Sequence, residues 1–587
     1  MKQILRGPVE MLRYPTLIML IMIFSSTAVG TLFVDDDGTS DFATIQDAIN
    51  VSEAGDEIIV LNGTYSENLI LDKSVILKGK GNPIISNDRI SDHLITITAK
   101  GVVLDGFTLT NCTNNSCNSG AVLVLSDECK ILNNTICYSL GHGLNLIESN
   151  GHLISGNKVH DNKHEGIHLR NANFSQMKNN QVFRNQKCGI ALESCQFNEL
   201  IINEVYENGE IGIHLLDSLG NDLTLNKIYN NVEDGIQIAN STNNVLLANL
   251  ISENSLIGLN VFGSSNNFAI GNLIWSSGEE GVLLTEPSND NVVVRNSISN
   301  NSFSGISLYG CGFNTLSENE IFRNYDNGIS MRDNSSVNLL SENAIYGNGR
   351  YGFNVEDSNS NFIQKNEIYD NLNGFIVRYS SDNTLVENDA HNNIFGMNLE
   401  FVQNMVISSN DIYNNTDDGI QLLHCDQSKI WQNKIHGNQV DGLHMARSEN
   451  NNVAENVIMN NGEYGIHVLD DSTQNLFVFN EIQNSSLGGF YLYEGVGNLV
   501  TCNVLADNQN FNARDNGGNK WLTNFYGDYV AESFAGGVTG SNPYFIYGQR
   551  GMVSMDTKPV VDSAVLNKWK PSIESIEFSF DMMGRAS

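Results

Sequence analysis

The sequence predicts a right-handed parallel β-helix, an all-β solenoid with three short strands in each coil of about 23 residues. Three observations predict it. A Gly-apolar-x-apolar motif recurs at a nearly constant interval, an Asn recurs at the same interval, and a short apolar segment lies between the two. A fixed period of this length indicates a repeat architecture rather than a set of globular domains.

The glycine motif sets the period of the repeat. Successive motif glycines are 22, 23 or 24 residues apart, a regularity that chance does not produce. We expect each glycine to permit a backbone angle that a side chain would forbid. The motif occurs at Gly120, Gly143, Gly166, Gly189, Gly212, Gly235, Gly258, Gly281, Gly305, Gly328, Gly352, Gly374, Gly396, Gly419, Gly442, Gly465 and Gly489.

The asparagines form a second register with the same period. Most of them open a unit that reads Asn-x-Ile-x-x-Asn, as at 366–371. Asn tolerates left-handed backbone geometry at turns, and Asn amides stacked in register hydrogen-bond one another. We therefore expect an asparagine ladder along the rod. Its members are Asn157, Asn180, Asn203, Asn226, Asn249, Asn272, Asn296, Asn319, Asn343, Asn366, Asn388, Asn410, Asn433, Asn456, Asn480 and Asn503.

The strands of one repeat are too short to stabilise one another. Stacked in register, each pairs with its equivalent in the next coil about 4.8 Å away. Inward Ile, Leu and Val then form continuous apolar columns. Leucine-rich and ankyrin repeats do not fit, because the repeat holds neither an LxxLxL signature nor a helix-forming segment.

The two ends of the chain differ from the repeats. We expect a signal peptide at 1–30, because basic residues precede an apolar run and small residues follow it. We expect an N-terminal cap with the first irregular coils at 31–110, regular coils at 111–510 and a C-terminal cap at 511–587. Ser40 or Asp41 is expected to cap a short helix whose apolar face covers the end of the rod. That face consists of Phe42, Ile45, Ala48 and Ile49.

The net charge and the cysteine content limit the kinds of partner and the cellular location that we expect. A formal net charge of −35 argues against nucleic acid, whose phosphates would be repelled. After the N-terminal run no stretch is long enough to span a membrane, so a cleaved chain would hold no stable span. Nine cysteines are compatible with export. Cys112 with Cys117, and Cys188 with Cys195, are close enough in sequence to pair.

Four segments near the N-terminal end carry a resemblance to a known family. The stretch Asp41-Phe-Ala-Thr-Ile-Gln-Asp-Ala-Ile is followed by Gly55-Asp-Glu-Ile-Ile-Val, Gly63-Thr-Tyr-Ser-Glu-Asn and Ile76-Leu-Lys-Gly. These segments resemble the NosD-like parallel β-helix proteins, the fold of many archaeal surface proteins and of carbohydrate-binding and sugar-hydrolase domains. The C-terminal segment from Asn519-Lys-Trp-Leu resembles the closing segment of archaeal members. For NosD proper, the resemblance implies a copper-accessory role in maturing nitrous oxide reductase.

A charged column is the first candidate site. Four residues after the motif glycines, five successive coils carry Tyr309, Arg332, Glu356, Arg378 and Glu400. Their charges would stand about 5 Å apart between coils. Such a column is most simply a solvated ladder of ion pairs. The alternative is a saccharide groove, in which Arg binds sugar carboxylates and Tyr stacks on sugar rings.

A second candidate site has the ligands of a cation. Asp418 and Asp441 precede motif glycines of adjacent coils, and His444 and His467 share a strand face near them. Neighbouring carboxylates raise one pKa or recruit a cation, so we consider Ca or Cu here, beside a turn in which Asp serves only the backbone. Two looser groups are His424 with Cys425, and the cluster His142, His160, His164 and His168.

Three functions remain open. The even repeat favours an exported, non-catalytic scaffold that binds a glycan or a cell-envelope protein, extracellular or periplasmic according to the host. A polysaccharide lyase, epimerase or hydrolase is the second possibility, although the constant interval leaves no room for a long groove-forming loop. The third is a copper-binding accessory protein of the NosD type.

Overall fold

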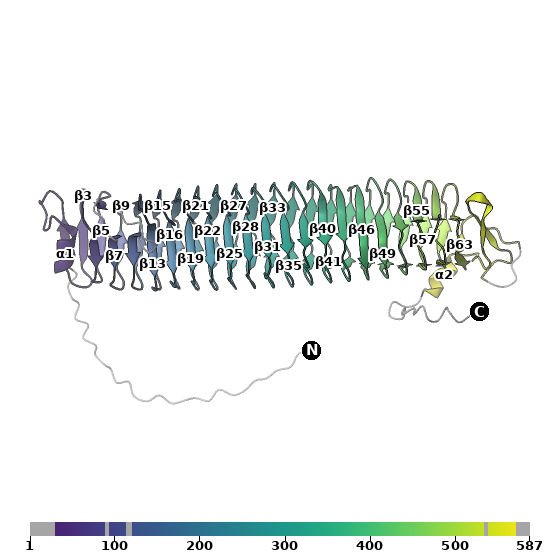
Figure 1. Cartoon of the computed structure of the whole chain (residues 1–587), viewed down its shortest axis with the longest axis horizontal. Coiled ribbons are helices and arrows are strands. Elements are labelled where there is room, and N and C mark those ends of the chain that lie inside the picture. Colours follow the sequence, from purple (N-terminus) through teal and green to yellow (C-terminus); the bar gives the residue numbers. More distant parts are fainter. Residues whose placement is uncertain (1–29, 88–92, 113–119, 533–537, 571–587) are drawn as a thin grey trace, which may run out of the picture.

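The computed structural model of the chain is a long rod of stacked coils (Figure 1). It describes residues 30–87, 93–112, 120–532 and 538–570. The expected signal peptide, apart from Gly30, lies outside these residues, and so does Cys117. Nowhere in the described ranges is a helix long and apolar enough to cross a membrane.

Each regular coil contributes one strand to each of three parallel sheets, A, B and C. In one coil these are β14 (Leu153–Ser155) in sheet A, β15 (Lys158–His160) in sheet B and β16 (Ile167–Arg170) in sheet C. Within the described residues the three sheets hold 24, 21 and 20 strands. At about 4.8 Å per coil the rod is roughly 100 Å long. The predicted parallel β-helix with three short strands per coil is confirmed.

Sheet C carries the candidate sites, and its register confirms the predicted columns. Tyr309 pairs with Arg332 in the next coil, and Glu356 pairs with Arg378. The strands of sheet C used below are β13 (His142–Ile147), β31 (Val282–Thr285), β34 (Ile306–Tyr309), β37 (Ile329–Arg332), β40 (Tyr351–Glu356), β43 (Asn373–Arg378), β46 (Phe395–Gln403), β49 (Ile420–Asp426), β52 (Leu443–Ala446), β55 (Tyr464–Leu469) and β58 (Gly488–Leu492).

The core is a bundle of apolar columns along the rod. In the coil described above, the central residues Ile154 and Val159 and the inward Leu169 are fully buried. Their counterparts one coil on, such as Met177 below Ile154, are equally buried. Because one continuous cluster of buried residues runs from Val34 to Ile546, the rod has a single core.

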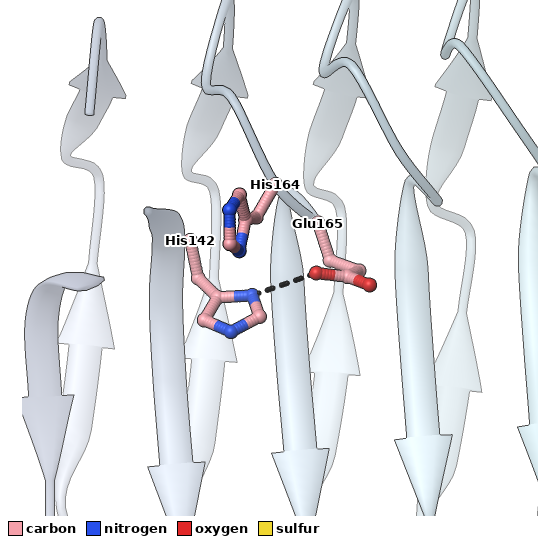
Figure 2. A group of neighbouring side chains, drawn as sticks. All are labelled: His142, His164 and Glu165. Carbon is pink, nitrogen blue, oxygen red and sulfur yellow. Dashed lines mark ion pairs between the residues drawn. The ribbon is translucent and has the colours of Figure 1, made fainter. Parts of the chain in front are cut away.

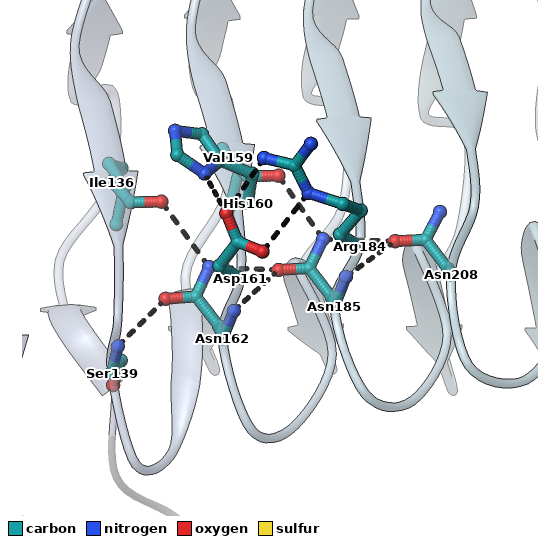
Figure 3. A network of polar contacts seen from close by, with 9 residues as sticks. All are labelled: Ile136, Ser139, Val159, His160, Asp161, Asn162, Arg184, Asn185 and Asn208. Atoms are coloured by element: carbon teal, nitrogen blue, oxygen red, sulfur yellow. Dashed lines mark hydrogen bonds and ion pairs between the residues drawn. The ribbon is translucent and has the colours of Figure 1, made fainter.

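The asparagine ladder is confirmed, and it is repeated at each of the three turns. In the predicted ladder, Asn180 Oδ1 accepts from both the backbone N and Nδ2 of Asn157, each at 3.0 Å. A second ladder at the turn from sheet B to sheet C includes Asn185 and Asn208 (Figure 3). A third lies at the turn from sheet C to sheet A and includes Asn221. Each buried amide therefore satisfies backbone groups that the turn leaves without strand partners.

The left-handed residue of each such turn is not the ladder asparagine. It is the residue before it, which can be of any type, as with Ile202 (φ 54°), Leu225 (φ 56°) and Arg295 (φ 56°). The expectation that these asparagines supply left-handed geometry is therefore wrong. The position demands Asn because its side chain is buried and must both donate and accept.

The motif glycines are also required for a different reason than expected. None of the described ones from Gly120 to Gly489 has a positive φ. A Cβ on Gly235 would lie 2.6 Å from Ile251 Cγ2 and 2.7 Å from Gly258 O in the next coil. Because these distances are below any real carbon contact, the glycine is fixed by close packing between coils and not by its backbone angle.

Both ends of the rod are closed by irregular elements. Helix α1 (Ile45–Val51) lies at the N-terminal end (Figure 1), with Ile45, Ala48 and Ile49 buried as predicted. Its N-cap is Thr44 and not Ser40 or Asp41. Asp41 instead accepts from Phe33 N at 3.0 Å and so holds β1 (Thr31–Val34). At the other end β64 (Tyr544–Tyr547) and β65 (Val553–Asp556) form an antiparallel hairpin, followed by α2 (Ala564–Trp569).

The closing hairpin continues the ladder. Asp556 is fully buried, and its carboxylate accepts from the backbone N of Thr523 and of Asn524, at 3.0 and 2.8 Å. Asn524 accepts from Asn503 N at 2.9 Å and so extends the predicted ladder by one asparagine beyond its last predicted member. Asp556 therefore satisfies the backbone groups that a further coil would otherwise bind.

Of the two pairs that spacing suggested, only Cys188 with Cys195 lies within the described residues; the pairing of Cys112 with Cys117 stays a prediction. Cys188 and Cys195 are both buried and are not bonded to each other. Cys188 lies beside Ala191 and Ile211, whereas Cys195 belongs to the main core. Burial raises the pKa of the Cys195 thiol to about 11, which keeps it protonated and unreactive.

The packing argument predicts the effect of adding one methyl group. Gly235→Ala should lower the free energy of unfolding by about 1–3 kcal/mol, because the new Cβ overlaps the next coil. Gly518→Ala is the matched control, since its Cβ would meet nothing within 4 Å. Urea unfolding followed by circular dichroism measures both. Equal stability of the two variants would contradict the packing argument.

Candidate functional site

The outward face of sheet C gathers the polar groups that the sequence singled out. Three positions of each coil meet there, namely the residue before the motif glycine and those two and four positions after it. Because the register is constant, residues of one kind form columns, as with Gln421, His444 and His467. Three places on this face hold clusters: the beginning of the regular coils, the middle and the C-terminal third.

The four residues predicted to bind a cation lie together in the C-terminal third. Asp418 and Asp441 are 1 % exposed. His444 Nδ1 is 3.1 Å from Asp418 Oδ2 and 3.6 Å from Asp441 Oδ2. His467 Nδ1 is 2.9 Å from Asp441 Oδ2. Asp441, His444 and His467 each offer a ligand atom, all within 4.8 Å of one another.

The same carboxylates also serve the backbone. Asp418 Oδ1 accepts from Asp441 N at 2.9 Å, and Asp441 Oδ1 accepts from Tyr464 N at 2.9 Å. Asp234, at the same position of another coil, accepts from Ile257 N at 3.1 Å. An acid before the motif glycine therefore has a structural role of its own, and cation binding by these residues stays a prediction.

His444 contacts two buried carboxylates, those of Asp418 and Asp441. Burial alone would lower its pKa, but the hydrogen bond to Asp418 and the charges of Asp418, Asp441 and Asp417 outweigh burial and raise it. His467 stacks on Tyr491 at 5.3 Å between ring centroids, and Tyr464 is tilted against both rings. The imidazole of His444 thus lies between the two carboxylates.

A shallow groove of about 400 Å³ lies in the middle of the face. Its lining comes from the turns before β31, β34, β37 and β40 and from β34 and β37 themselves. Tyr309 and Arg332, two of the predicted ligand residues, line it together with Glu280, and Phe303 at its side is 49 % exposed. Arg350 lines it too, and pairs with Asp326 at 3.2 Å. Burial raises the pKa of Glu280, and the nearby negative charge of Glu279 raises it further.

The other predicted ligand residues continue the column as ion pairs. Arg332 Nε is 3.7 Å from Glu356 Oε2, and Arg378 Nε is 2.7 Å from Glu400 Oε2. The predicted charge ladder is therefore present in the geometry. Only Tyr309 and Arg332 of the five line the groove, so saccharide binding by the whole column stays a prediction.

The histidine cluster at the beginning of the regular coils is tighter than the sequence indicated. The His142 and His168 rings stack at 4.7 Å, and the His142 and His164 rings meet edge to face at 5.3 Å. Glu165 joins them, with Oε2 2.9 Å from His142 Nδ1 (Figure 2). Burial and the nearby His142 lower the pKa of His168 to about 4.

Two other histidine groupings are not present. His160 belongs to sheet B, where it stacks on Phe183 at 4.7 Å and contacts Asp161 at 2.7 Å (Figure 3). His424 stacks on Phe401 at the surface, whereas Cys425 is fully buried in the core. Because His424 lies on the outer surface and Cys425 faces the core, the two residues form no common site.

Comparison with known proteins agrees with this architecture. Residues 93–249, 198–345 and 327–482 match the family described as "Right handed beta helix region". The chain belongs to the right-handed β-helix family. Residues 432–537 of this β-helix also match the family described as "Periplasmic copper-binding protein (NosD)", as the resemblance at the ends of the chain predicted.

Individual relatives of this β-helix are distant. A cell surface glycoprotein of Methanothermus fervidus is 35 % identical over 123 residues, a match that spans 20 % of each chain. Among solved structures, a Dettilon tailspike protein has TM-score 0.41 and 16 % identity, covering 53 % of this chain and 66 % of its own. A periplasmic alginate epimerase mutant has TM-score 0.32 and 14 % identity, covering 57 % and 77 %. Such scores carry no argument about activity.

Sequence reasoning missed several residues of these clusters. Glu165, Glu280 and Asp326 lie one or two positions before a motif glycine. Asp418 and Asp441 were noticed for that position, so the same position in every coil was the signal that could have found the others. Phe303 gave no signal, because its exposure depends on how the turn before β34 is folded.

The raised pKa of His444 makes the stability of this β-helix depend on pH. The ion pairs of a protonated His444 stabilise the fold fully below the unfolded pKa of about 6.5, and this stabilisation is lost as pH rises through the higher folded pKa. We expect the melting temperature to fall as pH rises above about 6.5, the unfolded pKa of histidine. In His444→Gln this dependence should be smaller, and at pH 6 the variant should lose about 3 kcal/mol. An unchanged pH slope in the variant would contradict the assignment.

Proposed function

We propose that this β-helix is an extracytoplasmic, non-catalytic protein that binds a glycan on the outward face of sheet C. One observation carries the proposal, namely the groove over β31, β34, β37 and β40. Sugars present hydroxyl groups and apolar C–H faces, and binding sites for them combine exposed rings with hydrogen-bonding side chains. Phe303, Tyr309, Arg332 and Glu280 supply both kinds of group within one groove.

The charges of the groove favour a neutral glycan over an acidic one. Its guanidinium groups already have carboxylate partners, since Arg350 pairs with Asp326 and Arg332 with Glu356. Glu279 and Glu280 in the same groove would repel a sugar carboxylate, and so would the net charge of −35. The groove crosses four coils, or about 14 Å, which suits a short run of an extended chain.

Location outside the cytoplasm has separate support. The first 30 residues have the layout of a signal peptide. The relative in Methanothermus fervidus is called a cell surface glycoprotein. A binding role on a cell envelope agrees with a rod whose coils differ little from one another along its length.

Binding of neutral and uronic-acid oligosaccharides to the purified chain, measured by calorimetry, tests the proposal. Phe303→Ala and Arg332→Ala should each weaken binding of a neutral oligosaccharide at least tenfold, or about 1.4 kcal/mol. Arg295→Ala is the matched control, because Arg295 forms an ion pair with Glu318 at 2.8 Å outside the groove. Absence of binding, or an equal loss in the control, would count against the proposal.

Glycoside hydrolysis is a second candidate, favoured by a single observation. Burial raises the pKa of Glu280, as a general acid requires, and Asp326 lies in the same groove. Hydrolysis of glycosidic bonds uses such a pair of carboxyl groups. If the groove is catalytic, wild type should release reducing ends from a bound oligosaccharide and Glu280→Gln should reduce the rate at least a hundredfold while still binding. No release by wild type would leave binding as the function.

A further inference from the structure

The histidine cluster at the beginning of the regular coils lies outside the groove and outside the predicted cation site. His142 opens β13, whereas His164 and Glu165 form the turn before β16, one coil further on. Gly143 N donates to Glu165 O at 3.1 Å, which fixes His142 and Glu165 side by side in adjacent coils. Figure 2 shows the three side chains converging from these two coils.

Three donor atoms of different side chains meet at one point. One ligand atom each of His142, His164 and Glu165 lies within 4.8 Å of the other two. The shortest separation is 2.9 Å, between His142 Nδ1 and Glu165 Oε2. The two imidazole rings are perpendicular, so their nitrogens can approach a common centre from different directions. Two imidazole nitrogens and a carboxylate oxygen are a ligand set of zinc sites that keep a fourth position open.

Neighbouring side chains hold the cluster in place. His168 stacks on His142 and is itself fixed by Asn145, with Nδ1 3.0 Å from Asn145 Oδ1. Lys187 Nζ is 4.0 Å from Glu165 Oε1. The carboxylate thus has a cationic neighbour besides the histidines. In metal centres, the side chains that bind the ion are typically held in orientation by hydrogen bonds and contacts from neighbouring side chains.

The cluster is also accessible. The His142 side chain is 4 % exposed, whereas that of Glu165 is 16 % exposed and His164 is half-buried. An ion could therefore enter from solvent and retain water at the open position. This differs from the cluster of Asp418, Asp441 and His444, in which both carboxylates are buried and already share His444.

We propose that His142, His164 and Glu165 bind one divalent ion of the late first-row transition metals, represented here by Zn²⁺. Imidazole donors suit Zn²⁺, Co²⁺, Ni²⁺ and Cu²⁺, whereas Ca²⁺ requires six to eight oxygen ligands. The site therefore discriminates against Ca²⁺. It lies outside residues 432–537, the segment that matches the copper-binding family.

Metal titration of the chelator-treated full chain tests this site without any glycan. Calorimetry should find a Zn²⁺ ion bound in the wild type, with affinity reduced at least a hundredfold in His164→Ala and in Glu165→Gln. His467→Ala is the matched control, because it removes a ligand atom of the other cluster, and it should leave this binding unchanged. Co²⁺ in place of Zn²⁺ should give visible absorption bands of nitrogen ligation that disappear in His164→Ala.

Folding of the variants is checked independently. Circular dichroism and the melting temperature without metal should match the wild type in His164→Ala, since His164 is half-buried and contributes no core packing. Zn²⁺ should then raise the melting temperature of the wild type but not of this variant. No Zn²⁺ binding by the wild type, binding that survives both substitutions, loss in His467→Ala, or displacement by equimolar Ca²⁺ would each overturn the proposal.

Discussion

Each coil of this rod depends on the next through buried amides. The Oδ1 of Asn180 accepts from two nitrogens of Asn157 in the preceding coil, and Asn157 Nδ2 also donates to Ile131 O at 2.8 Å. Removing such an amide would leave buried donors and acceptors without partners, at about 1–3 kcal/mol each. The three ladders therefore fix the register between coils, and the register in turn places every outward side chain of sheet C in its column.

The period of the repeat was sufficient to predict the fold, because buried columns require the same residue type at the same place in every coil. The charged column from Tyr309 to Glu400 and the grouping of Asp418 with His444 followed from the period alone. The predicted stacking of Asn amides was right. The backbone angles predicted for Gly and Asn were wrong, since packing between coils and side-chain burial leave no trace in a single sequence that distinguishes them from turn geometry.

What the period could not predict was the direction of side chains at the turns. His164 and Glu165 precede a motif glycine, where spacing alone does not decide whether a side chain faces solvent or the neighbouring coil. Likewise His160 is only four residues before His164 and five before Glu165, yet it belongs to sheet B. Its partners are Phe183 and Asp161. Distances between turns of different coils depend on the full backbone, and the sequence supplies only their order.

The carboxylate of Asp556 stands where the next asparagine of the ladder would be. An acceptor-only group can end the series because it requires no donor beyond it, whereas an asparagine would pass the requirement onward. Most interior coils, by contrast, offer and receive the same set of hydrogen bonds, with Ser or Met in place of the ladder asparagine at positions such as Ser277 and Met405. In this lineage, whole coils can therefore be gained or lost without disturbing either terminus. The length of the rod can change only in steps of one coil. The distance between its two ends can therefore evolve independently of the surfaces that the coils present.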